Sequence, residues 1–379
     1  MPPVSLLVKP ASGSCNMRCK YCFYADEQNK RVIPVYGMMS EKTMHAVIDQ
    51  AFAYAAGSDC TIAFQGGEPT LAGLAFYRDL TAYAAGHELA PHTPVHFSLQ
   101  TNGLALDEEW ASFLAEHHFL VGVSLDGMKH IHDRYRVDAQ GEGTYERVMD
   151  ALRLLAEHGV DTNILTVVTS ASARKAGKLY QFFRDNDLEF QQYIECLDPM
   201  GEMPGGREYS LTPEKYGRFL KDLFDAWHLD WRQGKGIYNR YFENLLMRLA
   251  GQLPESCAMT GVCSVQWVIE ADGSTYPCDF YALDEWLLGN INQDTLSQMD
   301  ERREGLGFIA WSRQVHEDCK ACQWFFLCRG GCRRHREPVR AEYAGKNYYC
   351  AAYQDFFSYA YPRLYSLYQD LIAGRIGRR

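Results

Sequence analysis

Three cysteines lie near the N-terminus at Cys-x3-Cys-x2-Cys spacing, at Cys15, Cys19 and Cys22. Three thiolates on a four-iron cluster leave one iron without a protein ligand, and a catalytic cluster needs such an open iron to bind a substrate group. A structural zinc site is the alternative reading, but it takes four ligands, and this loop has no fourth Cys or His. The spacing therefore favours a reactive iron–sulfur cluster.

Eight further cysteines lie in the C-terminal part of the chain. Eight make two sets of four, and four thiolates complete the ligation of a cluster, which suits electron transfer rather than substrate binding. Two zinc sites stay open as the alternative, because Cys-x2-Cys pairs occur in both kinds of protein. Cys60 and Cys196 are left over, and we expect them to be buried small apolar side chains. The eight are Cys257, Cys263, Cys278, Cys319, Cys322, Cys328, Cys332 and Cys350.

An alternating pattern of elements positions these cysteines. Up to about residue 196, short β-rich runs alternate with longer helix-like stretches, which predicts an α/β fold with parallel strands and crossover helices in a closed or partly closed barrel. Such barrels place their chemistry at the C-terminal ends of the strands. The expected strands are Ser5–Val8, Thr61–Gln65, His96–Thr101, Leu120–Leu125, Asn163–Thr169 and Phe190–Glu195, and the expected helices between them include Glu41–Ala56, Glu108–His117 and Tyr145–His158.

The pattern changes after the Gly- and Pro-containing stretch 198–207. Helices follow at about 213–231 and 240–249, then the cysteine-rich region, then an aromatic helix at about 351–372. We therefore expect a barrel domain over 1–235, a cysteine-rich domain over 236–350 and a C-terminal helical segment over 351–379.

The composition of the chain limits which partners it can bind and which cellular compartment it can occupy. The net charge of −10, from 38 basic and 48 acidic residues, argues against binding nucleic acid through its phosphates. No signal peptide begins the chain and no apolar run is long enough to span a membrane. We expect a cytoplasmic protein without a membrane or nucleic-acid partner, in which the cysteines outside Cys60 and Cys196 serve metal or cluster ligation and the thirteen cysteines form no disulfides.

The cysteine loop resembles that of the radical S-adenosylmethionine (SAM) superfamily, in which the residue before the third cysteine is aromatic, as Tyr21 is. Gly66-Gly67-Glu68-Pro69, after the second strand, looks like that superfamily's GGEP motif. The resemblance implies that Gly67 lets the backbone approach the SAM amino group closely. It also implies that Ser124, Arg136 and Leu197 contact SAM, although the segment 132–136 holds two arginines and only the family pattern selects the second.

The C-terminal cysteines resemble the SPASM extension of radical SAM enzymes. That resemblance, which spacing alone could not supply, implies an interleaved assignment of ligands to two auxiliary 4Fe–4S clusters. One cluster would take Cys257, Cys263, Cys278 and Cys332, and the other Cys319, Cys322, Cys328 and Cys350.

Nearly the whole chain is similar to the anaerobic sulfatase-maturating enzymes, in segments such as 9–12, 64–70, 196–199, 276–281 and 347–350. The resemblance implies oxidation of a cysteine or serine in a sulfatase polypeptide to Cα-formylglycine, through a 5′-deoxyadenosyl radical, with three 4Fe–4S clusters, SAM and a flavodoxin or ferredoxin reductant. It also implies that Asp279 is the base. On local sequence alone, a turn carboxylate that caps a backbone amide is the favoured interpretation of Asp279.

Two alternatives stay open. One is a SPASM maturase that crosslinks, epimerises or oxidises a different ribosomal peptide. The other is a non-catalytic zinc or electron-transfer module, which iron and sulfide analysis with a SAM-cleavage assay would separate from an enzyme.

Overall fold

A computed structural model describes residues 3–337 and 345–375, which form two compact units. The first unit comprises the described residues up to 124 together with 133–162 and 265–308. The second comprises 125–132, 163–264 and the described residues from 309 onward. The ends of the expected domains at 1–2 and 376–379, and the stretch 338–344, lie outside the described residues. The domain boundaries at 235/236 and 350/351 stay a prediction.

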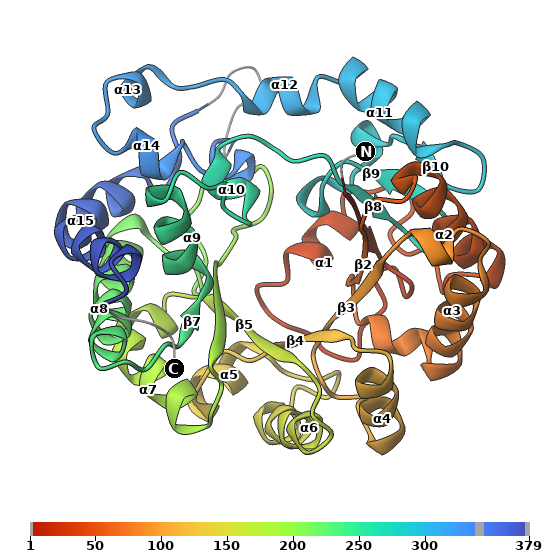
Figure 1. Cartoon of the computed structure of the whole chain (residues 1–379), viewed down its shortest axis with the longest axis horizontal. Coiled ribbons are helices and arrows are strands. Elements are labelled where there is room, and N and C mark those ends of the chain that lie inside the picture. Colours follow the sequence, from red (N-terminus) through yellow and green to blue (C-terminus); the bar gives the residue numbers. More distant parts are fainter. Residues whose placement is uncertain (1–2, 338–344, 376–379) are drawn as a thin grey trace. The chain divides into compact units, whose positions relative to one another are not determined.

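The first unit is built on a mostly parallel sheet in the order β10-β9-β8-β1-β2-β3-β4 (Figure 1). Strands β1 to β4 pair in parallel, and β8 pairs in parallel with β1, whereas β8, β9 and β10 form an antiparallel meander. The strands are β1 Val4–Val8, β2 Cys60–Phe64, β3 Val95–Thr101, β4 Leu120–Ser124, β8 Trp267–Ile269, β9 Ser274–Tyr276 and β10 Gly289–Asn290.

Helices cover the outer side of these strands in Figure 1. Helix α2 begins after Ser40, whose hydroxyl accepts a hydrogen bond from the Thr43 amide, as expected of an N-cap residue. Its apolar residues recur at helical spacing and are buried, including Met44, Val47 and Ile48. The helices of this unit are α1 Phe23–Gln28, α2 Glu41–Ala55, α3 Leu74–Gly86, α4 Glu108–Glu116, α6 Tyr145–Glu157 and α11 Leu296–Gly305.

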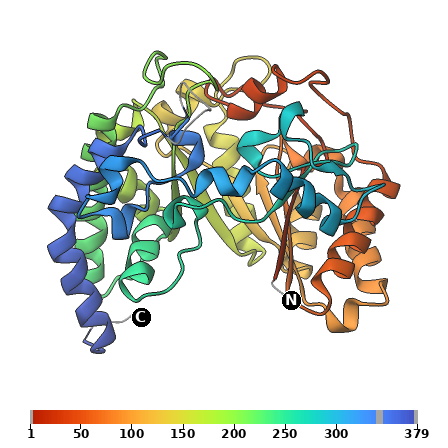
Figure 2. The same ribbon diagram turned by 90° about the horizontal axis from the view of Figure 1, so that it is seen from above.

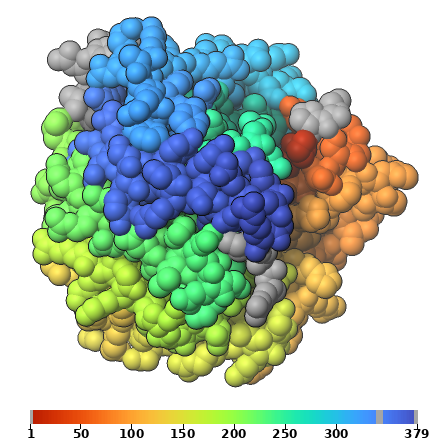
Figure 3. Space-filling view, turned by 60° about the vertical axis from the view of Figure 1, so that its left-hand side comes forward, coloured from red at the N-terminus to blue at the C-terminus, as the bar shows by residue number. Residues whose placement is uncertain are grey.

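The second unit contains β5 Thr162–Val168, β6 Phe190–Glu195 and β7 Tyr238–Asn239, with β6 parallel to both neighbours. Its longest helices are α8 Pro213–Arg232 and α15 Cys350–Ile372, which pack lengthwise on each other (Figure 2). The Phe356 ring of α15 lies 5.9 Å from the ring of Phe224 on α8 and 5.9 Å from that of Phe242 on α9, Arg240–Leu249. The opposite face of α15 forms part of the protein surface (Figure 3, dark blue).

The six strands and the named helices expected from the sequence are all present, with ends that differ by no more than a residue or two. The short strands β8, β9 and β10 were not expected, because runs of two or three residues carry too little pattern to recognise. No helix in the described part of the chain is long and apolar enough to cross a bilayer.

Candidate active site and cluster sites

The first cysteine triplet lies in the loop between β1 and α1. Cys15 and Cys19 are partly buried and Cys22 is exposed. Cys15 Sγ lies 3.3 Å from the amide nitrogen of Met17 and 3.7 Å from Nδ2 of Asn102, which follows β3. Burial raises the pKa of the Cys15 thiol to about 11. A ligated thiolate would therefore depend on the metal to displace its proton.

The two glycines after β2 let the cysteine loop approach closely. The Gly67 amide donates to Ser12 O at 2.8 Å, and a Cβ on Gly67 would lie 2.1 Å from Ser14 O. Gly66 has φ +125°, and a Cβ there would lie 2.9 Å from Ser12 O. In this unit the close approach at Gly67 is therefore to the cysteine loop itself. Contact of Gly67 with SAM remains a prediction.

Glu68 connects the Gly66–Pro69 turn to the end of β3. Its carboxylate is 1% exposed, and one oxygen accepts from the hydroxyls of Thr70 and Thr101, both at 2.7 Å. The other oxygen accepts from the Asn102 amide at 2.7 Å. Burial raises the pKa of Glu68, although these donors oppose the shift. Because Asn102 Nδ2 also donates to Asn16 Oδ1 at 2.7 Å, Glu68 holds the cysteine loop in place through Asn102.

Two of the residues expected to contact SAM lie together in the first unit. The Arg136 guanidinium lies 5.4 Å from the centroid of the Tyr21 ring, and both side chains are 7% exposed. Arg134, the other arginine of this segment, is exposed. Ser124 ends β4, where its hydroxyl accepts from Gln100 Nε2 at 3.2 Å. Burial thus distinguishes the two arginines that local sequence could not.

Leu197, the remaining expected SAM contact, is the second residue after β6 in the second unit. It lines a cavity that holds about 320 Å³ of empty space, partly open to solvent. Cys196 beside it is 1% exposed, and Cys60, in β2 of the first unit, is 0% exposed. The two leftover cysteines are thus buried, as expected.

Asp279 lies where three strand ends of the first unit converge. It follows Cys278 after β9 and begins the short 3₁₀ helix η4, Asp279–Tyr281. Its Oδ1 lies 2.6 Å from Nζ of Lys9, the first residue after β1, and its Oδ2 accepts from Nε2 of Gln65, the first residue after β2, at 2.9 Å. Within the described residues no backbone amide donates to this carboxylate, so the turn-capping role is absent.

Three of the four cysteines expected at one auxiliary cluster lie together in the second unit. Cys257 begins the short helix α10, Cys257–Thr260, and the Cys263 amide donates to Ser312 Oγ at 2.9 Å. Burial, followed by the charges of Cys257 and Cys263, raises the pKa of Cys332 to about 12. The fourth member, Cys278, belongs to the first unit, so its membership of this set rests on the resemblance.

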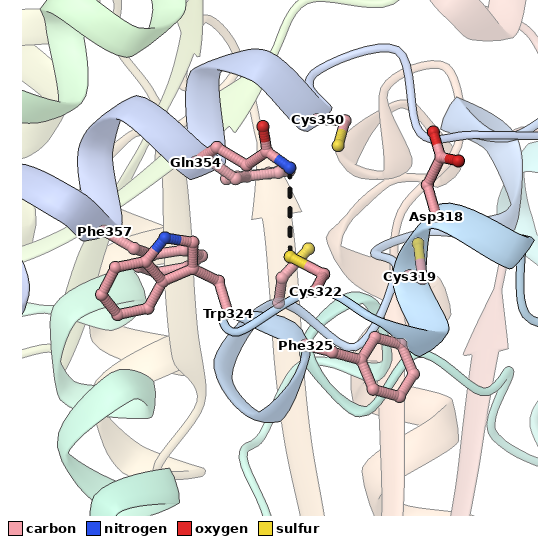
Figure 4. A pocket seen from close by; sticks show the side chains of 10 residues that line it. Asp318, Cys319, Cys322, Trp324, Phe325, Cys350, Gln354 and Phe357 are labelled. Carbon is pink, nitrogen blue, oxygen red and sulfur yellow. Dashed lines mark hydrogen bonds between the residues drawn. The ribbon is translucent and has the colours of Figure 1, made fainter.

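All four cysteines of the other expected set line one cavity in the second unit (Figure 4). The cavity holds about 350 Å³ of empty space, partly open to solvent, and Trp324, Tyr353 and Phe357 form part of its wall. Gln354 Nε2 lies 3.9 Å from Cys322 Sγ. In the described residues no three Cys, His, Asp or Glu side chains meet closely enough to hold a single metal ion. The four are Cys319, Cys322, Cys328 and Cys350.

Comparison with known proteins extends these observations. Residues 10–182 match the radical SAM superfamily and residues 257–323 match the iron-sulfur cluster-binding domain SPASM. The chain is 45% identical to the cysteine-type anaerobic sulfatase-maturating enzyme of Clostridium perfringens, over 98% of this chain and 100% of the relative. It belongs to the anaerobic sulfatase-maturating enzymes.

Other relatives agree with this membership. The serine-type anaerobic sulfatase-maturating enzyme of Bacteroides thetaiotaomicron is 30% identical, over 98% of this chain and 92% of the relative. A solved structure of native anSMEcpe with bound AdoMet and Cp18Cys peptide is 45% identical and superposes with a TM-score of 0.93, covering 98% of this chain and 100% of that one.

Membership confirms the fold class, an α/β partial (β/α)6 radical SAM barrel with a C-terminal SPASM domain. It confirms a radical SAM oxidoreductase that converts a cysteine or serine of a sulfatase to Cα-formylglycine. It also confirms 4Fe–4S clusters and SAM as the cofactors. Four cysteines line one cavity, and four thiolates are the number that completes the ligation of one auxiliary cluster.

The sequence did not predict individual roles for several residues around the site. Lys9, Gln65 and Glu68 lie within the segments that carry the resemblance to the maturating enzymes, so a signal was present. No role followed from it, because their partners Asp279 and Asn102 are distant in sequence.

Proposed function

We propose that this sulfatase-maturating enzyme is of the cysteine type and that Asp279 is its base. One observation carries the assignment of the base. The Asp279 carboxylate is 15% exposed, lies beside Cys278 in the chain, and is fixed by Lys9 and Gln65. A base must be both accessible to substrate and held in a defined orientation. The cysteine preference is supported by identities of 44–45% to cysteine-type relatives, against 29–30% to serine-type ones.

The residues divide the work between two steps. When bound, SAM and the barrel cluster would supply the 5′-deoxyadenosyl radical that removes a hydrogen from the substrate Cβ. Asp279 would then accept the thiol proton, and an auxiliary cluster held in part by its neighbour Cys278 would supply the acceptor for one electron. The resulting thioaldehyde reacts with water to give the aldehyde and hydrogen sulfide, so atoms and electrons balance.

The ligand sets form part of the same proposal. Cys15, Cys19 and Cys22 would hold the barrel cluster and leave one iron open for SAM. The set of Cys257, Cys263, Cys278 and Cys332 would hold one auxiliary cluster, and the set of Cys319, Cys322, Cys328 and Cys350 the other. Tyr21, Gly67, Ser124, Arg136 and Leu197 would contact SAM, and a buried Arg136 suits pairing with its carboxylate.

The partner and the compartment complete the proposal. A flavodoxin or ferredoxin would deliver the electron that starts each turnover, and the substrate would be a sulfatase polypeptide. We place the reaction in the cytoplasm, where thiols stay reduced. The thirteen free cysteines of the chain support that placement.

A peptide assay tests this function. Anaerobically reconstituted enzyme receives SAM, a reductant and one of two peptides that differ only in Cys or Ser, followed two and four residues later by Pro and Arg. We expect the cysteine peptide to exchange its thiol sulfur for an aldehyde oxygen, and the serine peptide to lose two hydrogens more slowly. Mass spectrometry detects both products, and a hydrazine reagent traps either aldehyde.

Two outcomes would contradict the proposal at different levels. If both peptides emerge unchanged while SAM is cleaved, the chain modifies a different ribosomal peptide. If serine is converted faster than cysteine, the oxidation stands and the cysteine preference is wrong.

A further inference from the structure

Lys9 is a fully buried lysine at the end of β1. Its side chain is 0% exposed, and its Nζ lies 2.6 Å from Asp279 Oδ1, 4.0 Å from Glu270 Oε1 and 3.6 Å from the centroid of the Tyr24 ring. The Nζ and Oδ1 atoms are not aligned as a hydrogen bond, so the contact is a close ion pair. Burying an ammonium is costly unless a carboxylate compensates it.

The surroundings keep this lysine charged. Burial acts against the charge, but the nearby Asp279, Tyr24 and Glu270 together raise the pKa of Lys9 above its usual value. Lys9 is therefore an ammonium throughout the pH range in which the enzyme works.

The main chain fixes where that charge lies. The Lys9 amide donates to Ile269 O at the end of β8 at 2.8 Å, and Lys9 O accepts from the Ser12 amide at 3.0 Å. The side-chain stem passes Gly66, where an added Cβ would come within 3.1 Å of Lys9 Cβ. The ammonium thus has little freedom to move relative to β8 and the cysteine loop.

The second carboxylate near Lys9 is already compensated. Glu270, fully buried, accepts from Arg31 Nη1 at 2.8 Å, from Ser12 Oγ at 2.9 Å and from the Tyr24 hydroxyl. The closest charges of the group are two cations, Lys9 and Arg31, and two carboxylates, Glu270 and Asp279, and the buried Glu27 acts on Lys9 more weakly. Only Asp279 is partly exposed, at 15%. The ammonium of Lys9 therefore pairs with the carboxylate of Asp279, which lies at the accessible edge of the group.

We propose that Lys9 is a positioning residue for the oxidation step, which holds the Asp279 carboxylate in the orientation that accepts the substrate proton. This inference rests on the proposed role of Asp279. Lys9 is too deeply buried to touch a substrate, and it neither gains nor loses a proton during the step. It acts after hydrogen removal, so its loss uncouples SAM cleavage from product formation.

Substitutions at Lys9 test the inference in the anaerobic holoenzyme with the cysteine peptide. Lys9→Met keeps the length and removes the charge, and Lys9→Arg keeps the charge. For Lys9→Met we expect normal iron content and continued SAM cleavage, with formylglycine per SAM cleaved reduced at least about tenfold and the peptide KM little changed. Lys9→Arg should recover part of the yield.

Arg303 provides the matched control. It is another buried cation of the first unit, 1% exposed, paired with Asp300 and stacked 4.9 Å over the Trp267 ring. Arg303→Met should lower the melting temperature but leave formylglycine per SAM cleaved unchanged. An equal loss of yield in Arg303→Met and Lys9→Met would mean that any buried charge defect uncouples the enzyme, and would overturn the inference.

A double-mutant cycle with Asp279→Asn separates the two proposals. If Lys9 acts through Asp279, adding Lys9→Met to Asp279→Asn causes no further loss of product, and the double variant melts higher than Lys9→Met alone because the charges balance again. The inference about Lys9 fails if Lys9→Met lowers the melting temperature equally in the wild type and in Asp279→Asn. It also fails if Lys9→Met keeps the wild-type yield of formylglycine per SAM cleaved. In both cases the role of Asp279 as the base is unaffected. If Asp279→Asn itself keeps the wild-type rate, the proposed base fails.

Discussion

At the scale of single residues, exposure separates two carboxylates that both follow strand ends. Glu68 is 1% exposed and accepts hydrogen bonds on both oxygens from groups of β3 and its own turn, so its task is to hold the cysteine loop. Asp279 is 15% exposed, and its buried side contacts Lys9 and Gln65. A carboxylate must be partly exposed to exchange a proton with a substrate.

Replacing Asp279 by Asn keeps the shape and removes the basic charge. We expect SAM cleavage to persist while peptide product falls by about 10² to 10⁴, the usual contribution of a general base. Asp272 provides the control, because it lies in the β8–β9 turn and its carboxylate accepts from the Ser274 amide at 2.9 Å. Asp272→Asn should leave the product rate unchanged. Wild-type product formation by Asp279→Asn would rule out Asp279 as the base.

Gly67 supports a second prediction at this scale. A Cβ there would lie 2.1 Å from Ser14 O, so Gly67→Ala forces the cysteine loop to shift. We expect loss of about one third of the bound iron and of SAM cleavage, measured by iron analysis and product chromatography. Gly86→Ala, at the end of α3 with no atom near the added Cβ, should change neither. Full iron loading of Gly67→Ala would show that the loop adapts.

At the scale of elements, α15 links the second unit's helical core to a cluster site. Its first residue is Cys350, and on the next two turns Tyr353, Gln354 and Phe357 line the same cavity. On the same turns, Phe356 packs between α8 and α9 at 0% exposure. The packing of this aromatic face therefore determines where Cys350, a proposed cluster ligand, lies.

Phe356→Ala tests this link between packing and ligation. Removing a buried phenylalanine from a packed core costs about 3–5 kcal/mol, so the melting temperature should fall and the iron at this site should become labile to chelators. Tyr365, on the same helix and 41% exposed, is the control, and Tyr365→Ala should have little effect. A destabilised Phe356→Ala that holds its iron as tightly as the wild type would separate helix packing from cluster binding.

At the scale of the whole molecule, family domains and compact units divide the chain differently. The SPASM match covers 257–323, but residues 265–308 belong to the first unit, where β8, β9 and β10 extend the barrel sheet. The SPASM segment thus supplies Cys278 and Asp279 to the same unit as the SAM-type cysteine loop. Cys278 thus belongs to the first unit, whereas Cys257, Cys263 and Cys332 belong to the second.

Reconstituted enzyme should bind about twelve irons and twelve sulfides per chain, the sum of three four-iron clusters. Replacing Cys15, Cys19 and Cys22 together by Ala should remove about one third of the iron and abolish SAM cleavage, because the other eight ligands remain. Replacing Cys60 and Cys196, which are buried and belong to no set, should leave the iron content unchanged. Stoichiometric zinc without sulfide would contradict the cluster assignment.

The sequence by itself determined the strand and helix pattern, the three groups of cysteines and the family, because these depend on local periodicity, spacing and short motifs. Tertiary structure alone decided the surroundings of Asp279. Lys9 and Gln65 lie more than two hundred residues before it and meet it only because β1, β2, β8 and β9 end at neighbouring positions of one sheet. It also distinguished the buried Arg136 from the exposed Arg134, whereas contact of Arg136 with SAM stays a prediction. Ion pairs and burial of this kind arise from strand register and packing between distant segments, which no local pattern of residues encodes.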